Sequence, residues 1–145
     1  MATNVSGQTP SPQKQQPQGF QESLDKISRQ NFSEATEVRE FPNGKLELLK
    51  FGDRVIGRAT LQPGWKWSES VKSIAGTESC EAPHFQYHVS GVLRIRMDDG
   101  TEIECKAGDI SNVPPGHDAW VVGDEPAVIV DFQGMATYAQ EPHKH

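Results

Sequence analysis

The chain has 145 residues, of which 34% are hydrophobic, and it carries a formal net charge of −6 with a pI near 5.3. This length is enough for one domain with one hydrophobic core. The acidic balance, with lysines and arginines scattered rather than clustered, argues against nucleic acid or an anionic membrane as a partner and leaves small molecules or proteins.

Two features of the chain indicate its compartment. No apolar run approaches the roughly 20 residues of a membrane span, and no basic-then-apolar signal pattern opens the sequence. We therefore expect a cytoplasmic protein. In a reducing compartment its two cysteines, Cys80 and Cys105, are expected to remain thiols.

The N-terminal part differs in composition from the rest. Residues 1–19 are almost entirely Gln, Pro, Ser, Thr, Asn and Gly, which bury too little apolar surface to offset the entropy of ordering. They predict a disordered tail. In residues 20–34, Leu24 and Ile27 stand at helical spacing between polar residues, which predicts a short helical lead-in.

From residue 35 onward, short apolar segments alternate with turn residues. Asn43-Gly44 is a pair preferred in tight hairpins, and Pro63-Gly64 and Asp98-Asp99-Gly100 are further turn signals. The segments between such signals predict strands over residues 36–41, 45–51, 54–61, 92–97, 101–106 and 127–132. Regular turns without a long helical pattern predict an all-β sandwich or barrel over residues 35–134. Residues 135–145 are left as a C-terminal tail, whose histidines we expect to be solvated.

The stretch from Trp65 to Gly134 resembles the cupin superfamily of small barrels. The second cupin motif places a glycine, a proline and another glycine at fixed spacing before a metal-binding histidine. Gly108, Pro114 and Gly116 match this spacing, but the ligand position falls on Ala119. The resemblance is therefore one of scaffold more than of ligand identity.

The first cupin motif has two histidines, a glutamate and then a glycine. Counting back from Gly91 places His84, Cys80 and Glu78 at the three ligand positions. Each replacement is itself able to bind a metal. His117 stands two residues before Ala119, on the same face of a strand. The resemblance thus implies a site of Glu78, Cys80, His84 and His117, in which the thiolate favours zinc and the two imidazoles also allow iron(II).

A metal-free interpretation stays open beside this one. Cys80 alone is the kind of residue most often buried as a small hydrophobe, and Glu78 is equally compatible with a solvated loop. His84 and His117 could instead hydrogen-bond each other or backbone carbonyls in a pocket without metal. Ala119 at the family's ligand position favours that alternative.

Parity along the strand that begins at His84 puts Gln86 and His88 on the same face. In a cupin this face points into the barrel, where polar groups need partners, water or a polar ligand. Gln86 and His88 are therefore predicted to line the pocket, unless a bulge near Ser90-Gly91 turns His88 outward. Of the three tryptophans at most one is expected to contact a ligand, and Trp120 is our candidate.

The cupin resemblance implies an all-β double-stranded β-helix, the cupin jelly-roll barrel, after a short N-terminal helix and a disordered tail. Cupins commonly pair through exposed strands, so we expect a homodimer of twofold symmetry.

The first functional hypothesis is a module that binds a small polar molecule in the barrel, through a divalent metal. The alternative is a metal-dependent enzyme of the dioxygenase or isomerase class acting on a small polar or carboxylated substrate.

Overall fold

The computed structural model describes residues 25–136 and 138–140. The chain divides into two compact units, of which one comprises Gln30–Lys50 with Arg54–His145 and the other Met1–Arg29 with Phe51–Asp53. The first unit holds the two sheets and the candidate site. The predicted disordered tail, residues 1–19, lies outside the described residues.

The predicted helical lead-in, residues 20–34, is described from residue 25. Residues 27–31 have no regular secondary structure, and a 3-10 helix, η1 (Phe32–Glu34), ends the segment. Asn31 caps η1, because its Oδ1 accepts the Ser33 N–H at 2.9 Å. Asp25, the first described residue, is helical, and residues 20–24 of the predicted lead-in lie outside the described residues. Beyond Asp25 the lead-in holds η1, and Ile27 is fully exposed.

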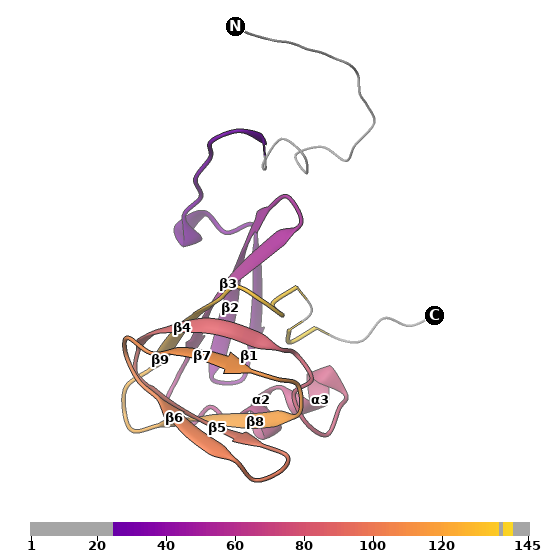
Figure 1. Ribbon diagram of the computed structural model, residues 1–145, viewed down its shortest axis with the longest axis vertical. Helices are drawn as coiled ribbons and strands as arrows, with labels where there is room; N and C mark the ends of the chain where they lie inside the picture. Colours follow the sequence, from indigo (N-terminus) through magenta and orange to yellow (C-terminus); the bar gives the residue numbers. More distant parts are fainter. Residues whose placement is uncertain (1–24, 137, 141–145) are drawn as a thin grey trace, which may run out of the picture. The chain divides into compact units, whose positions relative to one another are not determined.

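The described strands form two antiparallel sheets, which lie face to face in Figure 1. One sheet has the order β1-β2-β3-β9-β4-β7 and the other the order β6-β5-β8. The strands are β1 (Glu37–Phe41), β2 (Gly44–Phe51), β3 (Arg54–Leu61), β4 (His84–Ser90), β5 (Val92–Met97), β6 (Glu102–Cys105), β7 (Ile110–Val113), β8 (His117–Val122) and β9 (Ala127–Asp131). The six strands predicted from turn signals are confirmed, with ends that differ by at most one residue.

The first hairpin turn differs from the prediction by one residue. Phe41 pairs with Gly44 across the β1–β2 ladder, so the turn consists of Pro42 and Asn43 rather than Asn43 and Gly44. Pro42 suits the first central position of a turn, and Asn43 takes the left-handed conformation at φ 64°. Gly44 is required for another reason: a Cβ there would lie 2.5 Å from Cε1 of Phe41.

The core lies between the two sheets, and buried residues alternate with less buried ones along most strands, whereas β2 buries four consecutive residues, Leu46 to Leu49. In β4, His84, Gln86 and His88 are buried, while the residues between them are exposed. In β5, Leu93 and Ile95 are buried. The face predicted from parity is therefore confirmed for β4, and it brings polar groups from this strand into an otherwise apolar interior.

Two short helices, α2 (Trp67–Ser70) and α3 (Lys72–Ala75), connect β3 to β4. Trp67, the first residue of α2, and Val71, which lies between the two helices, are buried. Asp118 at the start of β8 ties α2 to that strand, because its Oδ1 accepts the Ser68 N–H at 3.0 Å. Gly76 ends α3 in the left-handed conformation, at φ 76°. The chain then returns to the barrel at Cys80.

Described residues of the expected C-terminal tail pack onto the barrel. Met135 and Tyr138 are buried and belong to the core cluster. The guanidinium of Arg39 in β1 donates to three carbonyl oxygens of this segment, those of Met135 (3.3 Å), Ala136 (2.9 Å) and Tyr138 (2.7 Å). Because three backbone acceptors are satisfied by one side chain, this segment is held in one arrangement against the sheet.

Neither cysteine is in a disulfide. Cys80 and Cys105 are both buried free thiols. Among the residues that the structure describes, no helix is long and apolar enough to cross a membrane.

Candidate metal site and barrel cavity

The structure brings Cys80, His84 and His117 together. Cys80 lies in the loop that enters β4, and it forms a bridge with His117, the first residue of β8. The Cys80 N–H donates to the His117 carbonyl oxygen at 2.8 Å, and the His117 N–H donates back at 3.3 Å. His84 is the first residue of β4. These backbone hydrogen bonds hold the main chains of Cys80 and His117 side by side, so their side chains start from neighbouring positions.

The distances among these side chains suit a shared metal ion. Their ligand atoms all lie within 4.8 Å of one another, and Sγ of Cys80 is 3.8 Å from Nε2 of His84. Tetrahedral zinc, with bonds of about 2.3 Å to sulfur and about 2.0 Å to nitrogen, separates two such ligands by roughly 3.6 Å. All three residues are at least 94% buried, with 3%, 6% and 3% exposure. An ion could be held here with only small movements of the side chains.

Each histidine is oriented through its Nδ1 atom. Nδ1 of His84 faces a carboxylate oxygen of Asp131, which is fully buried at the end of β9. Nδ1 of His117 donates to the carbonyl oxygen of Pro114 at 2.9 Å. Because carboxylates and carbonyls only accept, Nδ1 carries a proton in both rings, and Nε2 is the nitrogen left to face a metal. This is the arrangement in which an imidazole is ready to bind a metal through Nε2.

Burial sets the ionisation of two of these groups. It raises the pKa of the Cys80 thiol to about 12. Burial, with the nearby His84 ring as the second cause, lowers the pKa of His117 to about 4. At neutral pH and without metal, the thiol is protonated and His117 is neutral. A metal that binds here must therefore displace the thiol proton.

The fourth predicted ligand does not join the cluster. The Glu78 side chain is 94% exposed, and Oε1 pairs with Nζ of Lys72 at 3.1 Å. Turning this hydrated and paired carboxylate into the barrel would cost desolvation free energy. The geometry agrees with the alternative interpretation, in which Glu78 lies in a solvated loop.

Gln86 and His88 are both buried, and both contact Ser111 of β7. The Gln86 side-chain amide donates to Ser111 Oγ at 3.2 Å, and Nε2 of His88 lies 2.8 Å from the same atom. The register of β4 against β9 shifts between His88 and Ser90, yet His88 remains only 1% exposed. Burial lowers the pKa of His88. The irregularity considered as the alternative is thus present, but it does not turn His88 outward.

Trp120 lies on the other face of β8. Ala119 and Val121 on either side of it are buried, and Nζ of Lys66 lies 5.3 Å from the centre of the Trp120 ring. This is cation–π geometry at the surface of the barrel. The structure does not bring Trp120 into contact with the cavities described below.

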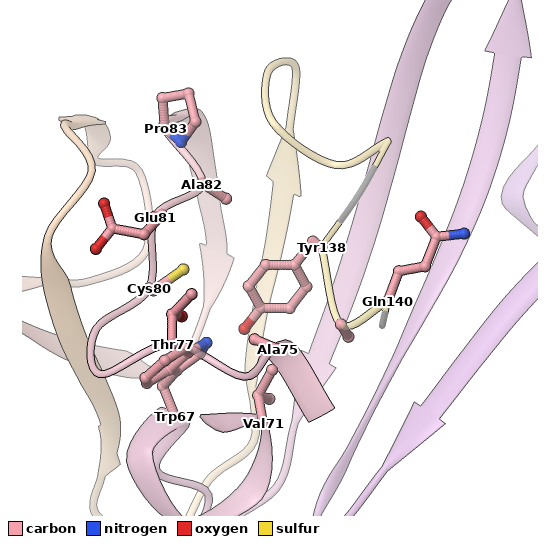
Figure 2. Close-up of a pocket in the computed structure, with 11 residues that line it drawn as sticks. Trp67, Val71, Ala75, Thr77, Cys80, Glu81, Ala82, Pro83, Tyr138 and Gln140 are labelled. Carbon is pink, nitrogen blue, oxygen red and sulfur yellow. The ribbon is translucent and has the colours of Figure 1, made fainter. Parts of the chain in front are cut away.

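Two cavities flank the Cys80–His84–His117 cluster. The outer pocket has a volume of about 260 Å³, and in Figure 2 the Cys80 sulfur points into it toward the Tyr138 ring. The inner cavity, about 40 Å³, lies inside the barrel and is lined by His84, Gln86 and Trp65 among mainly apolar side chains. Tyr138 lines both, and its ring centre is 5.7 Å from that of His84. The Tyr138 ring therefore stands where the two spaces approach each other.

Three site residues were missed from the sequence. Asp131 follows Ala127 and Ile129 on the inward face of β9, so a charged residue at that parity was a usable signal. Trp65 is one of the two tryptophans not predicted to contact a ligand, and Tyr138 falls within the predicted C-terminal tail. Nothing local distinguishes these two, because their position depends on how distant segments fold back onto the barrel.

Comparison with known proteins identifies the fold. No protein-family model and no curated protein matches the chain. A protein of unknown function from Rhizobium leguminosarum bv. viciae matches with a TM-score of 0.56 and 18% identity, over 81% of this chain and 99% of that one. A sugar phosphate isomerase of the cupin superfamily from Silicibacter pomeroyi matches with a TM-score of 0.53 and 20% identity, over 72% of this chain and 73% of that one. The chain thus has the cupin jelly-roll fold predicted from its motifs.

Proposed function

We propose that this cupin-fold chain binds a divalent transition metal through Cys80, His84 and His117 and uses it to hold a small polar molecule in the barrel. The observation that carries the proposal is the convergence of three buried ligand atoms within 4.8 Å. The orientation of both imidazoles by acceptors at Nδ1 supports it. Imidazoles that bind a metal characteristically donate their other ring N–H to a carboxylate or a carbonyl in this way.

The donor set favours zinc. One thiolate sulfur and two imidazole nitrogens suit this borderline-soft ion, and iron(II) is the second choice. Three protein ligands leave a fourth position, which a water or the bound molecule would fill. A metal there would act as a Lewis acid toward an oxygen of that molecule.

The open fourth position also supports the second candidate, a metal-dependent enzyme, since catalytic zinc sites share this feature. Such an enzyme needs an acid or base near the metal. Glu81 is the charged residue in the lining of the outer pocket, but its carboxylate points away from the Cys80 sulfur in Figure 2. The geometry therefore favours a binding module over catalysis.

Metal analysis of protein purified without an affinity tag tests the proposal. We expect about one zinc ion per chain in the wild type and loss of that ion in Cys80→Ser, His84→Ala and His117→Ala. Cys105→Ser is the matched control, since Cys105 is the other buried free thiol. A double variant, His143→Gln with His145→Gln, controls for binding by the terminal histidines. Equal metal content in the wild type and the three ligand variants would overturn the proposal.

Cobalt(II) substitution gives a spectroscopic test of the ligand set. Bound cobalt should show tetrahedral ligand-field bands and a thiolate-to-metal charge-transfer band in the near ultraviolet. Cys80→Ser should remove the charge-transfer band, whereas Cys105→Ser should retain it. A spectrum typical of octahedral cobalt, without charge transfer, would contradict a site that contains Cys80.

A further inference from the structure

Trp65 presents a buried hydrogen-bond donor that has no acceptor. Among the residues that the structure describes, its indole Nε1 is the buried side-chain nitrogen or oxygen atom without a hydrogen-bond partner. The residue is 2% exposed. Buried donors are rarely left unsatisfied, because the loss of hydration is then not compensated. An acceptor within reach of Nε1 would remove this cost.

The inner cavity is the space that could supply this acceptor. Trp65 lines it together with His84 and Gln86, and the remaining walls are mainly aliphatic. Its volume of about 40 Å³ has room for one or two water-sized groups. The cavity thus suits one small polar group attached to an apolar body.

The charges around the cavity indicate which polar group fits. Within the described part of the chain, no lysine or arginine lines it. An anion in the cavity would be desolvated without a compensating cationic side chain, whereas a neutral acceptor avoids this cost.

We propose that the inner cavity is a subsite for a neutral oxygen acceptor, a ketone, aldehyde or amide carbonyl, which accepts a hydrogen bond from the Trp65 Nε1–H. The subsite rests on the proposed function and deepens it by naming the class of molecule held in the barrel. The ligand class is then a small carbonyl compound rather than a carboxylate. Tyr138, which lines both cavities, limits the length of the molecule.

The test uses small probes and the indole resonances of the full-length protein. Formamide and formate are matched in size but differ in charge. In ¹H–¹⁵N spectra, formamide should shift the Trp65 indole resonance in a saturable manner, and formate should shift it much less. The Trp65→Phe variant assigns this resonance among those of the three tryptophans. A larger response to formate, or no response to either probe, overturns the proposal.

Affinity is measured independently of Trp65 from the methyl resonances of Ile95 and Ile129, which line the same cavity. Trp65→Phe keeps an aromatic ring and removes the donor, so the dissociation constant for formamide should rise about 3- to 10-fold, as for one neutral hydrogen bond. Trp120→Phe is the matched control and should leave the constant unchanged. An equal constant in Trp65→Phe and the wild type would mean that the donor serves only water, and it would overturn the subsite.

Zinc-loaded and chelated protein separate this proposal from the proposed function. A formamide response of Trp65 in both states supports the subsite, even when metal analysis shows no ion at Cys80. Zinc binding without any response of Trp65 overturns the subsite and leaves the metal site intact. Tyr138→Ala should additionally allow longer amides, such as butanamide, to shift the Trp65 resonance. If butanamide acts equally on the wild type, Tyr138 does not limit ligand length.

Discussion

At the scale of single residues, the geometry of the site depends on the acceptor behind each imidazole. Asp131 does more than face His84, because its Oδ1 also accepts the N–H groups of Phe85 (3.2 Å) and Gln133 (3.0 Å). One carboxylate thus anchors the end of β9, the start of β4 and the tautomer of a proposed ligand. A neutral side chain of the same shape can keep only part of this role.

Asp131→Asn is expected to reduce metal affinity by about 10- to 100-fold. The amide oxygen can still accept from Phe85 and Gln133, but the NH₂ group would face Nδ1 of His84 and favour the tautomer with a proton on Nε2. The dissociation constant for zinc, measured by competition with a chelator, checks this. Asp118→Asn is the control, because Asp118 binds the Ser68 N–H of α2. Equal losses of zinc affinity in both variants would indicate that the substitutions act by destabilising the fold as a whole.

The metal-free protein should lose stability as the pH falls from about 6.5 to about 4. The pKa of His117 is lowered to about 4 in the folded chain, whereas an unfolded histidine titrates at about 6.5. The unfolded chain therefore binds the proton first. The free energy of unfolding that His117 contributes is fully present above pH 6.5 and is lost as the pH falls toward the folded-state pKa. The total loss is about 3 kcal/mol.

Urea unfolding in the presence of a chelator, at pH 7 and at pH 4.5, measures this loss. The decrease in the free energy of unfolding should be smaller in His117→Gln than in the wild type. His88, whose pKa is lowered by burial as well, contributes equally to both proteins. Identical decreases would show that His117 titrates normally in the folded protein.

At the scale of elements, the segment after β9 completes the wall of the site. It turns at Gly134, which has a φ of 77° and whose Cβ, if present, would lie 2.0 Å from the backbone oxygen of Pro83. This close approach sets the C-terminal segment beside the loop that carries Cys80. Arg39 then holds the following carbonyl groups, and Tyr138 reaches the barrel.

Gly134→Ala should therefore destabilise the protein more than another substitution at a positive φ. Gly108 has a φ of 95°, but a Cβ added there would meet no atom within 4 Å, so Gly108→Ala measures the cost of the left-handed conformation alone, about 1 to 2 kcal/mol. Gly134→Ala adds a clash with backbone. We expect a lower thermal midpoint and faster amide exchange in residues 135–140 for Gly134→Ala. Similar midpoints for the two variants would refute the close approach.

At the scale of the whole molecule, β4 and β7 expose large apolar side chains on the outer face of the six-stranded sheet. Phe85, Tyr87 and Val89 of β4 are 42% to 50% exposed, and Ile110 of β7 is 66% exposed. Tyr87 stands between Ile110 and Val130 in the register of the sheet. An apolar patch of this kind is complementary to itself across a twofold axis, and it includes the edge strand β7.

We expect this face to pair two copies of the chain as a homodimer. Tyr87→Glu places a charge at the centre of the patch, so it should shift the sedimentation coefficient at micromolar concentration from that of a dimer to that of a monomer. Ile103→Glu is the control, because Ile103 is similarly exposed, at 46%, on β6 of the other sheet. A wild-type monomer, or a dimer that survives Tyr87→Glu, would contradict this assembly.

The sequence alone determined the local features of this chain. Turn residues define the ends of the strands because glycine, proline and asparagine act through their own backbone conformations. Alternation identified the inward face of β4, since a strand repeats every two residues. The cupin spacing pointed to Cys80 and His84, and strand parity added His117, two residues before the ligand position that Ala119 occupies.

Only the tertiary structure decided which other groups reach the site. Glu78 has the right spacing but pairs with Lys72 in solvent, while Asp131 lies 47 residues from its partner His84. Tyr138 and Trp65 gain their roles from a segment that folds back and from a cavity that no local pattern encodes. Such contacts depend on packing between elements distant in sequence, where side-chain volume and the satisfaction of buried polar groups decide the outcome.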